Sequence, residues 1–218
     1  MAKAGSKYAV PAGTLKATTI NWKKGKLIHR IHSTAFTETQ YNPSPKSNAR
    51  FSPIRDVAGK IIPVLYGGST MDCALMETVF RDVPYAPGLK NIDKARLLDQ
   101  AHSIVVAKAD LSLIDLSNVA LRKLGIDRTH LIDTTKAHYP DTRKWAEALY
   151  QQVPVCQGLR WISRQDDSAE ALILFANRIS PGVLGVVQPA ASLLVHSFAA
   201  LPVAQLARRI GAKLTGRI

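Results

Sequence analysis

The stretch that decides the fold is VLYGGSTMDCALMETVF, residues 64–80. Its first part, Val64–Tyr66, is an apolar segment that predicts a strand. The pair Gly67–Gly68 then leads into an apolar-periodic segment, which we expect to form a helix beginning at Ser69 or Thr70. A buried strand followed closely by a buried helix is therefore predicted at this point of the chain.

One charge in this predicted helix has no local explanation, and it is Glu77. At about 100° per residue, the side chains from Met71 to Phe80 make the helix apolar nearly all round, which is typical of a buried helix. A carboxylate in a buried helix is costly unless another group pairs with it or a ligand uses it. Glu77 therefore either faces a cleft or pairs with a buried arginine.

Composition indicates one globular domain with a strong positive charge. The chain has 218 residues, of which 46% are hydrophobic and 21% charged, and 29 Lys and Arg against 16 Asp and Glu give a net charge of +13. This balance favours polyanions, phosphate-bearing small molecules or an acidic protein as partners. The two cysteines, Cys73 and Cys156, lack metal-ligand spacing, which favours a reducing, cytoplasmic setting.

The N-terminal residues do not predict a signal peptide, and the most apolar stretch does not predict a membrane helix. Lysines interrupt the N-terminal residues throughout, so no signal-peptide core is expected there. The most apolar stretch, residues 182–207, contains Gln188, Pro189, His196 and Pro202, so it lacks the unbroken run of about 20 apolar residues that a membrane helix needs. We therefore expect no transmembrane segment.

The pattern along the chain predicts a single mixed α+β domain. Residues 1–26 are basic, contain no acid and show no period, so we treat them as an arm, and residues 27–218 as the domain. LIHRIH, residues 27–32, alternates as a strand and is followed by a long loop. Further strands and helices are expected at residues 61–66 (strand), 103–109 and 111–117 (a strand pair), 141–152 (helix opened by Asp141), 158–163 and 171–179 (strands), and 203–211 (helix after Pro202).

Familiar catalytic signatures are absent, and isolated polar residues remain instead. The sequence has no GxGxxG, Walker A, HExxH, GxSxG or CxxC motif, and its histidines are too scattered for a metal site, so we assign no metal. The remaining candidates share one property, which is their position at the ends of apolar segments: Arg30, Arg50, Tyr66, Glu77 and Ser163.

The short sequence motifs around these five residues resemble those of the RES-domain family. The resemblance begins with Arg30 in LIHRIH and Arg50 in NARFSP, and it continues with Tyr66 and Glu77 in VLYGGSTMDCALMETVF. It ends with Ser163 in GLRWISR, which precedes an apolar strand. The match covers residues 27 to 178, although Ile31 replaces an often aromatic residue and the GGRF-type word has lost its glycines.

This resemblance implies a fold similar to that of ADP-ribosyltransferases and a bacterial toxin that consumes NAD. Members of the family split the nicotinamide–ribose bond with water or inorganic phosphate as acceptor, and an antitoxin of the Xre type holds the toxin inactive. NAD is then a substrate, and no prosthetic group is expected. We further expect no membrane and no direct nucleic-acid partner, and the oligomeric state stays open between a homo-oligomer and a toxin–antitoxin hetero-oligomer.

Residue chemistry agrees with the roles that the resemblance implies. A carboxylate beside the sugar stabilises the oxocarbenium character that develops on the ribose, and we assign this role to Glu77. Guanidinium groups bind phosphate oxygens through paired hydrogen bonds, and we assign this role to Arg30 and Arg50. Tyr66 would stack on the cationic nicotinamide ring, and Ser163 would hold a ribose or phosphate oxygen.

Other interpretations stay open for the same residues. Glu77 with either arginine could be a structural ion pair, Tyr66 a core residue and Ser163 a turn residue. Two further functions remain, namely transfer of ADP-ribose to a protein and a non-enzymatic nucleic-acid-binding module that uses the basic arm. The latter predicts binding that weakens steeply with salt and survives Glu77→Gln.

Overall fold

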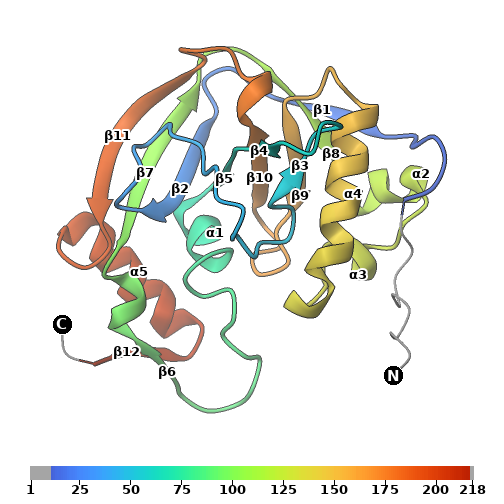
Figure 1. Ribbon diagram of the computed structural model, residues 1–218. Coiled ribbons are helices and arrows are strands. Elements are labelled where there is room, and N and C mark those ends of the chain that lie inside the picture. Colours follow the sequence, from blue (N-terminus) through green and yellow to red (C-terminus); the bar gives the residue numbers. More distant parts are fainter. Residues whose placement is uncertain (1–10, 217–218) are drawn as a thin grey trace.

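A mixed eight-stranded sheet forms the centre of the computed structural model, which describes residues 11–216 (Figure 1). Its order is β1-β8-β9-β10-β5-β2-β7-β11, and β8 and β9 are its parallel pair. The strands are β1 (Thr18–Trp22), β2 (Leu27–Ser33), β3 (Ile54–Arg55), β4 (Ile61–Ile62), β5 (Val64–Gly68), β6 (Lys90–Asp93), β7 (Gln100–Ala107), β8 (Leu111–Asp115), β9 (Gly158–Ile162), β10 (Glu170–Phe175), β11 (Leu184–Ser192) and β12 (Ala212–Thr215). The α-helices are α1 (Met71–Met76), α2 (Asn118–Leu124), α3 (Arg128–Leu131), α4 (Tyr139–Gln152) and α5 (Ser197–Arg209). This arrangement confirms the single mixed α+β domain.

The core consists of three apolar clusters on the two faces of the sheet. One cluster joins α4 and the neighbouring loops to β5, β9 and β10, and a second joins α1 and α5. The third, on the opposite face, is built from β1, β2, β5, β7, β8 and β10. Figure 1 shows α1 and α4 on either side of β3 in this view. Residues of α1 and of the start of α4 line one cavity over the central strands.

The first helix is shorter than its apolar pattern predicted. It begins after Thr70, whose side chain accepts a hydrogen bond from the Cys73 backbone N–H at 3.0 Å. Gly68 allows the helix to lie close to β5, since a Cβ at that position would come within 2.9 Å of the Cys73 Sγ. The helix ends at Met76, so Glu77 is its C-cap and does not lie inside it. The carboxylate is therefore carried at the end of a buried helix, where it can turn away from the core.

Two other predicted helices are present with different starts. Helix α4 begins at Tyr139, two residues before Asp141, with Pro140 in its first turn. Helix α5 begins at Ser197 and contains Pro202, whereas we predicted a start after that proline. Pro202 costs one intrahelical hydrogen bond, but buried apolar residues on both sides of it keep the helix continuous. None of the helices within residues 11–216 combines the length and the apolar character that a bilayer-spanning helix needs.

Two expectations about the sheet differ from the structure. Strands β7 and β8 are consecutive in the chain, but they do not pair: β7 lies between β2 and β11, whereas β8 lies between β1 and β9. The reason is that the chain crosses to the other end of the sheet after Ala107. Residues 18–22, which we placed in the basic arm, form β1 and pair with β8. Residues 1–10 of that arm lie outside the described residues.

Candidate functional site

A cavity of about 170 Å³ lies between α1, the start of α4 and strands β2, β5, β9 and β10. Arg50, Tyr66 and Glu77 line it, so the fold brings together three of the five predicted site residues, although they are far apart in the sequence. Glu77 is the acid among the described residues that line this cavity. The cavity therefore presents one carboxylate, arginine side chains and aromatic rings to a ligand.

Ser163 orients the Glu77 carboxylate from behind. The Ser163 hydroxyl donates to Glu77 Oε1 at 2.7 Å, and it accepts hydrogen bonds from the backbone N–H groups of Gln165 and Asp166 at 3.1 and 3.2 Å. Ser163 is fully buried and does not line the cavity. Its position therefore favours a role in holding Glu77 and the turn after β9, while the predicted contact with a ribose or phosphate oxygen stays a prediction.

Arg50 is buried at the cavity wall and keeps part of its guanidinium uncommitted. Only 5% of the residue is exposed, and burial lowers the pKa of its guanidinium, an effect that Tyr139 and Glu77 partly offset. Its Nη1 donates to Thr134 Oγ1 at 3.0 Å, and its guanidinium carbon lies 5.4 Å from the centre of the Tyr139 ring. Among the described residues, no acid lies within 4.0 Å of Arg50, so Arg50 and Glu77 do not form the structural ion pair considered above.

Tyr66 contributes an aromatic wall whose hydroxyl is fixed. The Tyr66 hydroxyl accepts a hydrogen bond from the Phe51 backbone N–H at 3.1 Å, and its ring meets the Trp161 ring edge-on with centres 6.4 Å apart. Burial raises the pKa of this hydroxyl to about 12, so Tyr66 is neutral at physiological pH. The neutral Tyr66 ring lines the cavity, and its stacking on a flat cationic ring stays a prediction.

Arg30 does not line the cavity. It lies on the other face of β2 from Ile31, which does line the cavity, and it is 3% exposed. Its guanidinium donates to the backbone carbonyls of Thr37, Glu38 and Gln40 at 2.5–3.0 Å. Burial lowers the pKa of Arg30 to about 10. The structure thus places Arg30 as the support of the loop after β2, apart from the three residues that line the cavity together.

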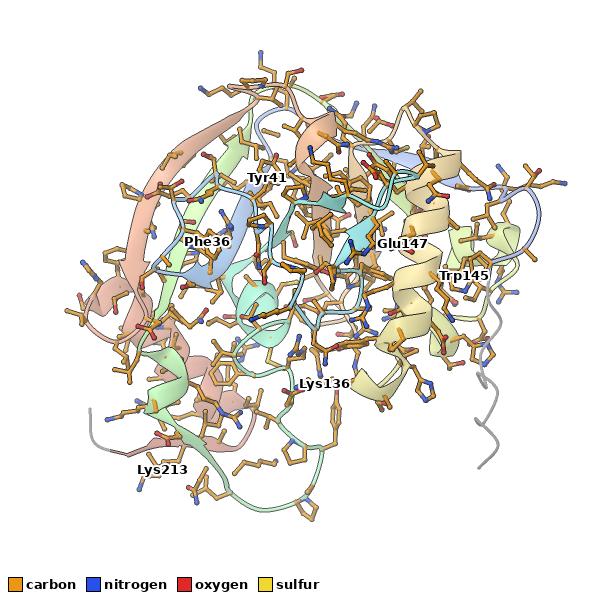
Figure 2. All side chains as sticks on the ribbon, in the orientation of Figure 1. Phe36, Tyr41, Lys136, Trp145, Glu147 and Lys213 are labelled. Carbon is orange, nitrogen blue, oxygen red and sulfur yellow. The ribbon has the colours of Figure 1, made fainter. Side chains whose placement is uncertain are left out.

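A second cavity of about 320 Å³ adjoins the first and is strongly basic. Arg50, Arg81 and Tyr139 line both cavities, which makes them the junction between the two. Lys136, labelled in Figure 2, and Arg164 add two further cations to the second cavity. The described lining of this cavity has one acid, Asp82, which pairs with Lys136. The second cavity is therefore suited to an anionic group.

Sequence reasoning missed Arg81 and Tyr139. The signal for Arg81 was its position four residues after Glu77, which would place both side chains on one face of a helix. Tyr139 offered only a weak signal, as an aromatic residue before a proline at a helix start. Tyr139 lies in a segment distant from the other site residues, so local patterns could not show that it meets them.

Comparison with known proteins identifies the family. A family model described as the RES domain matches residues 27–196, which is most of the chain. Neither a curated protein nor a solved structure matches the chain. The matched segment includes all five residues that carried the resemblance, from Arg30 to Ser163. The chain therefore belongs to the RES-domain family.

Proposed function

We propose that the protein cleaves the nicotinamide–ribose bond of NAD, with water or inorganic phosphate as acceptor. RES domains are known as NAD-degrading toxins, and this chain belongs to that family. The observation that carries the proposal is the Glu77 carboxylate, held by Ser163 at the wall of an aromatic cavity that opens into a basic one.

A single carboxylate is sufficient for this reaction. When the bond between ribose C1′ and the pyridinium nitrogen breaks, both bonding electrons go to the nitrogen, and nicotinamide leaves as a neutral molecule. No proton donor is needed, whereas glycosidases that expel an alcohol use a pair of carboxylic acids. The first cavity has one acid in its described lining, which agrees with this difference. Glu77 would stabilise the positive charge that develops on the ribose.

The two cavities match the two chemical halves of the substrate. The first, lined by Tyr66, Tyr139 and Trp161, suits the flat cationic nicotinamide ring. The second, with its excess of cations, suits the diphosphate. Arg50 at the junction would contact the phosphate next to the nicotinamide ribose. An elongated dinucleotide would then place its C1′ beside Glu77.

The toxin role and its control follow from the family and form part of the proposal. Consumption of NAD in the bacterial cytoplasm would make the protein toxic, and an Xre-type antitoxin that covers the junction of the cavities would hold it inactive. The net charge of +13 would favour an acidic surface on this partner. Likeness to the ADP-ribosyltransferase fold, with its eight-stranded mixed sheet as support, belongs to the same proposal.

The test is an assay of nicotinamide release by the purified protein, combined with mass analysis of the second product. Hydrolysis would yield ADP-ribose and a proton, while phosphorolysis would yield ADP-ribose 1″-phosphate. A labelled polypeptide in place of either product would reject both and support transfer to a protein. If the antitoxin-free, folded protein released no nicotinamide with or without phosphate, the proposal would be wrong.

A further inference from the structure

Arg81 lines both cavities, and among the described residues its side chain has one weak ionic partner, Asp82. Arg81 lies in the turn after α1, and its side chain is 26% exposed while it lines both cavities. It belongs to none of the motif words that indicated the family.

The backbone of Arg81 is fixed by the same loop that holds Glu77. Gln165 Nε2 donates to the Arg81 carbonyl at 2.8 Å, and the Tyr85 hydroxyl donates to Gln165 Oε1 at 2.7 Å. Ser163, two residues earlier in this loop, donates to the Glu77 carboxylate. One short loop thus holds both the Glu77 carboxylate and the Arg81 backbone, and both residues line the first cavity.

The side chain of Arg81 has unused hydrogen-bonding capacity. Its Nε is buried and makes no hydrogen bond to any residue between 11 and 216. The nearest acid, Asp82, lies 3.7 Å from this nitrogen, and the Asp82 carboxylate is also shared with Lys136 and 46% exposed. Such an exposed pair contributes little. No strong contact with the described residues therefore occupies the Arg81 guanidinium, and Arg81 lines both cavities that a ligand can enter.

In contrast to Arg81, Arg30 has a guanidinium that is already occupied by hydrogen bonds. Backbone carbonyls of the loop after β2 accept from both of its terminal nitrogens, so Arg30 has little left to offer a ligand. Arg50, in contrast, uses Nη1 alone for its hydrogen bonds to the described residues and shares both cavities with Arg81. Arg81 therefore shares both cavities with Arg50, whereas Arg30, the second arginine that the sequence predicted for the site, lines neither.

We propose that Arg81, together with Arg50, binds phosphate oxygens of a ligand at the junction of the two cavities. This inference rests on the proposed function for the identity of the substrate, but the binding of an oxyanion can be measured without it. The oxyanion comes from one of two sources, the diphosphate of the dinucleotide or an inorganic phosphate that attacks the ribose. Two guanidinium forks suit either one, because each presents paired donors to phosphate oxygens.

The first experiment measures binding of inorganic pyrophosphate and of inorganic phosphate by calorimetry, using the full chain and three variants. Arg81→Gln removes the charge, Arg81→Lys keeps the charge without the planar fork, and Arg122→Gln removes the same charge from an exposed residue of α2 that lines neither cavity. We expect Arg122→Gln to bind like the wild type and Arg81→Gln to bind at least about tenfold more weakly, with Arg81→Lys between them. Equal binding by Arg81→Gln and the wild type, or no binding by the wild type, would overturn the inference.

The second experiment distinguishes the two sources by steady-state kinetics with NAD. If Arg81 binds the diphosphate, Arg81→Gln raises KM for NAD at least about tenfold with a smaller change in kcat. If it binds the attacking phosphate, the variant loses the acceleration by phosphate and keeps its KM for NAD. Wild-type values in both respects would overturn the inference. Arg81-dependent binding of pyrophosphate by a protein that does not cleave NAD would support the oxyanion site and reject the proposed function.

Discussion

Replacing Arg30 with methionine is expected to lower the stability of the fold far more than the rate of the chemical step. Methionine has a similar length and apolar stem but offers no donor to the carbonyls of Thr37, Glu38 and Gln40. These three bonds attach the loop after β2 to the sheet. Since Arg30 does not line either cavity, its removal takes no group away from the site.

The magnitude follows from two opposing contributions. Hydrogen bonds that involve a charged group stabilise by roughly 1.5–3 kcal/mol each, so the three bonds contribute about 5–9 kcal/mol. Burial of the cation opposes them: it lowers the pKa of Arg30 from 12.5 to about 10, which corresponds to about 3 kcal/mol. The net loss in the free energy of unfolding is therefore about 2–6 kcal/mol. For a chain of this size we expect Tm to fall by about 4–24 °C.

The assay is urea unfolding of the wild type, Arg30→Met and Arg30→Lys, with Arg122→Met as the matched control. The control replaces an exposed arginine and is expected to change stability by less than about 0.5 kcal/mol. Arg30→Lys keeps one charged donor group and should fall between the wild type and Arg30→Met. Nicotinamide release is measured below the lowest Tm, where Arg30→Met should keep kcat within about tenfold. An Arg30→Met variant with an unchanged unfolding midpoint and no activity would refute this reasoning and place Arg30 on the substrate.

Three further predictions follow from other contacts. Ser163→Ala removes the hydroxyl that donates to Glu77, so kcat should fall about tenfold to a hundredfold while KM for NAD stays nearly unchanged. The control is Ser168→Ala, which removes a hydroxyl at the surface, and equal rates for the two variants would contradict this role of Ser163. Burial, and then the neighbouring His29 and His32, lowers the pKa of His102 to about 4. Because the unfolded chain binds this proton near pH 6.5, the free energy of unfolding is highest above pH 6.5 and falls as the pH drops toward 4, by about 2 kcal/mol at pH 5. Urea unfolding at pH 7.5 and at pH 5 should therefore show a smaller pH dependence for His102→Gln than for the wild type. Trp22 lies in β1 and is 2% exposed, so Trp22→Ala should lower the free energy of unfolding by about 3–5 kcal/mol. A loss below about 1 kcal/mol would show that the fold does not depend on β1.

Local periodicity predicted the elements that carry most of the site. The alternation of LIHRIH gave β2, the apolar run before Gly67 gave β5, and the pattern after Pro140 gave α4. Each of these depends on residues close together in the chain, where the 2.0 or 3.6 period is a direct consequence of backbone geometry. Cap residues set the exact bounds: Thr70, not Ser69, is the N-cap, so α1 begins at Met71.

Contacts between distant segments could not be predicted in this way. The separation of β7 from β8 depends on which strand edges are occupied elsewhere in the sheet, and neither strand carries that information. Likewise, Arg30 and Arg50 are alike as residue types, and only the fold shows that backbone carbonyls occupy Arg30. Arg81 joins the site because the loop after β9 holds its backbone, a contact that spans 84 residues.

The helix that follows the family match supports the site from outside. Helix α5 begins at Ser197, one residue after the matched segment ends, and its buried face packs in the same apolar cluster as α1. An ion pair between Arg209 and Asp72 joins the two helices at the surface. Because α1 carries Glu77 at its end, α5 contributes to the placement of the carboxylate without contacting the cavity that Glu77 lines.

The most direct test of the central claim is nicotinamide release from NAD by Glu77→Gln, with Glu147→Gln as the matched control. Glutamine has the shape of glutamate and can still accept the hydrogen bond from Ser163, so the variant removes the charge and leaves the fold intact. Glu147, labelled on α4 in Figure 2, accepts a hydrogen bond from the Arg55 backbone N–H, which glutamine can also accept, and it lines neither cavity. We predict a loss of about a hundredfold or more in kcat for Glu77→Gln and none for Glu147→Gln. Wild-type release of nicotinamide by Glu77→Gln would contradict the assignment of this carboxylate to the reaction.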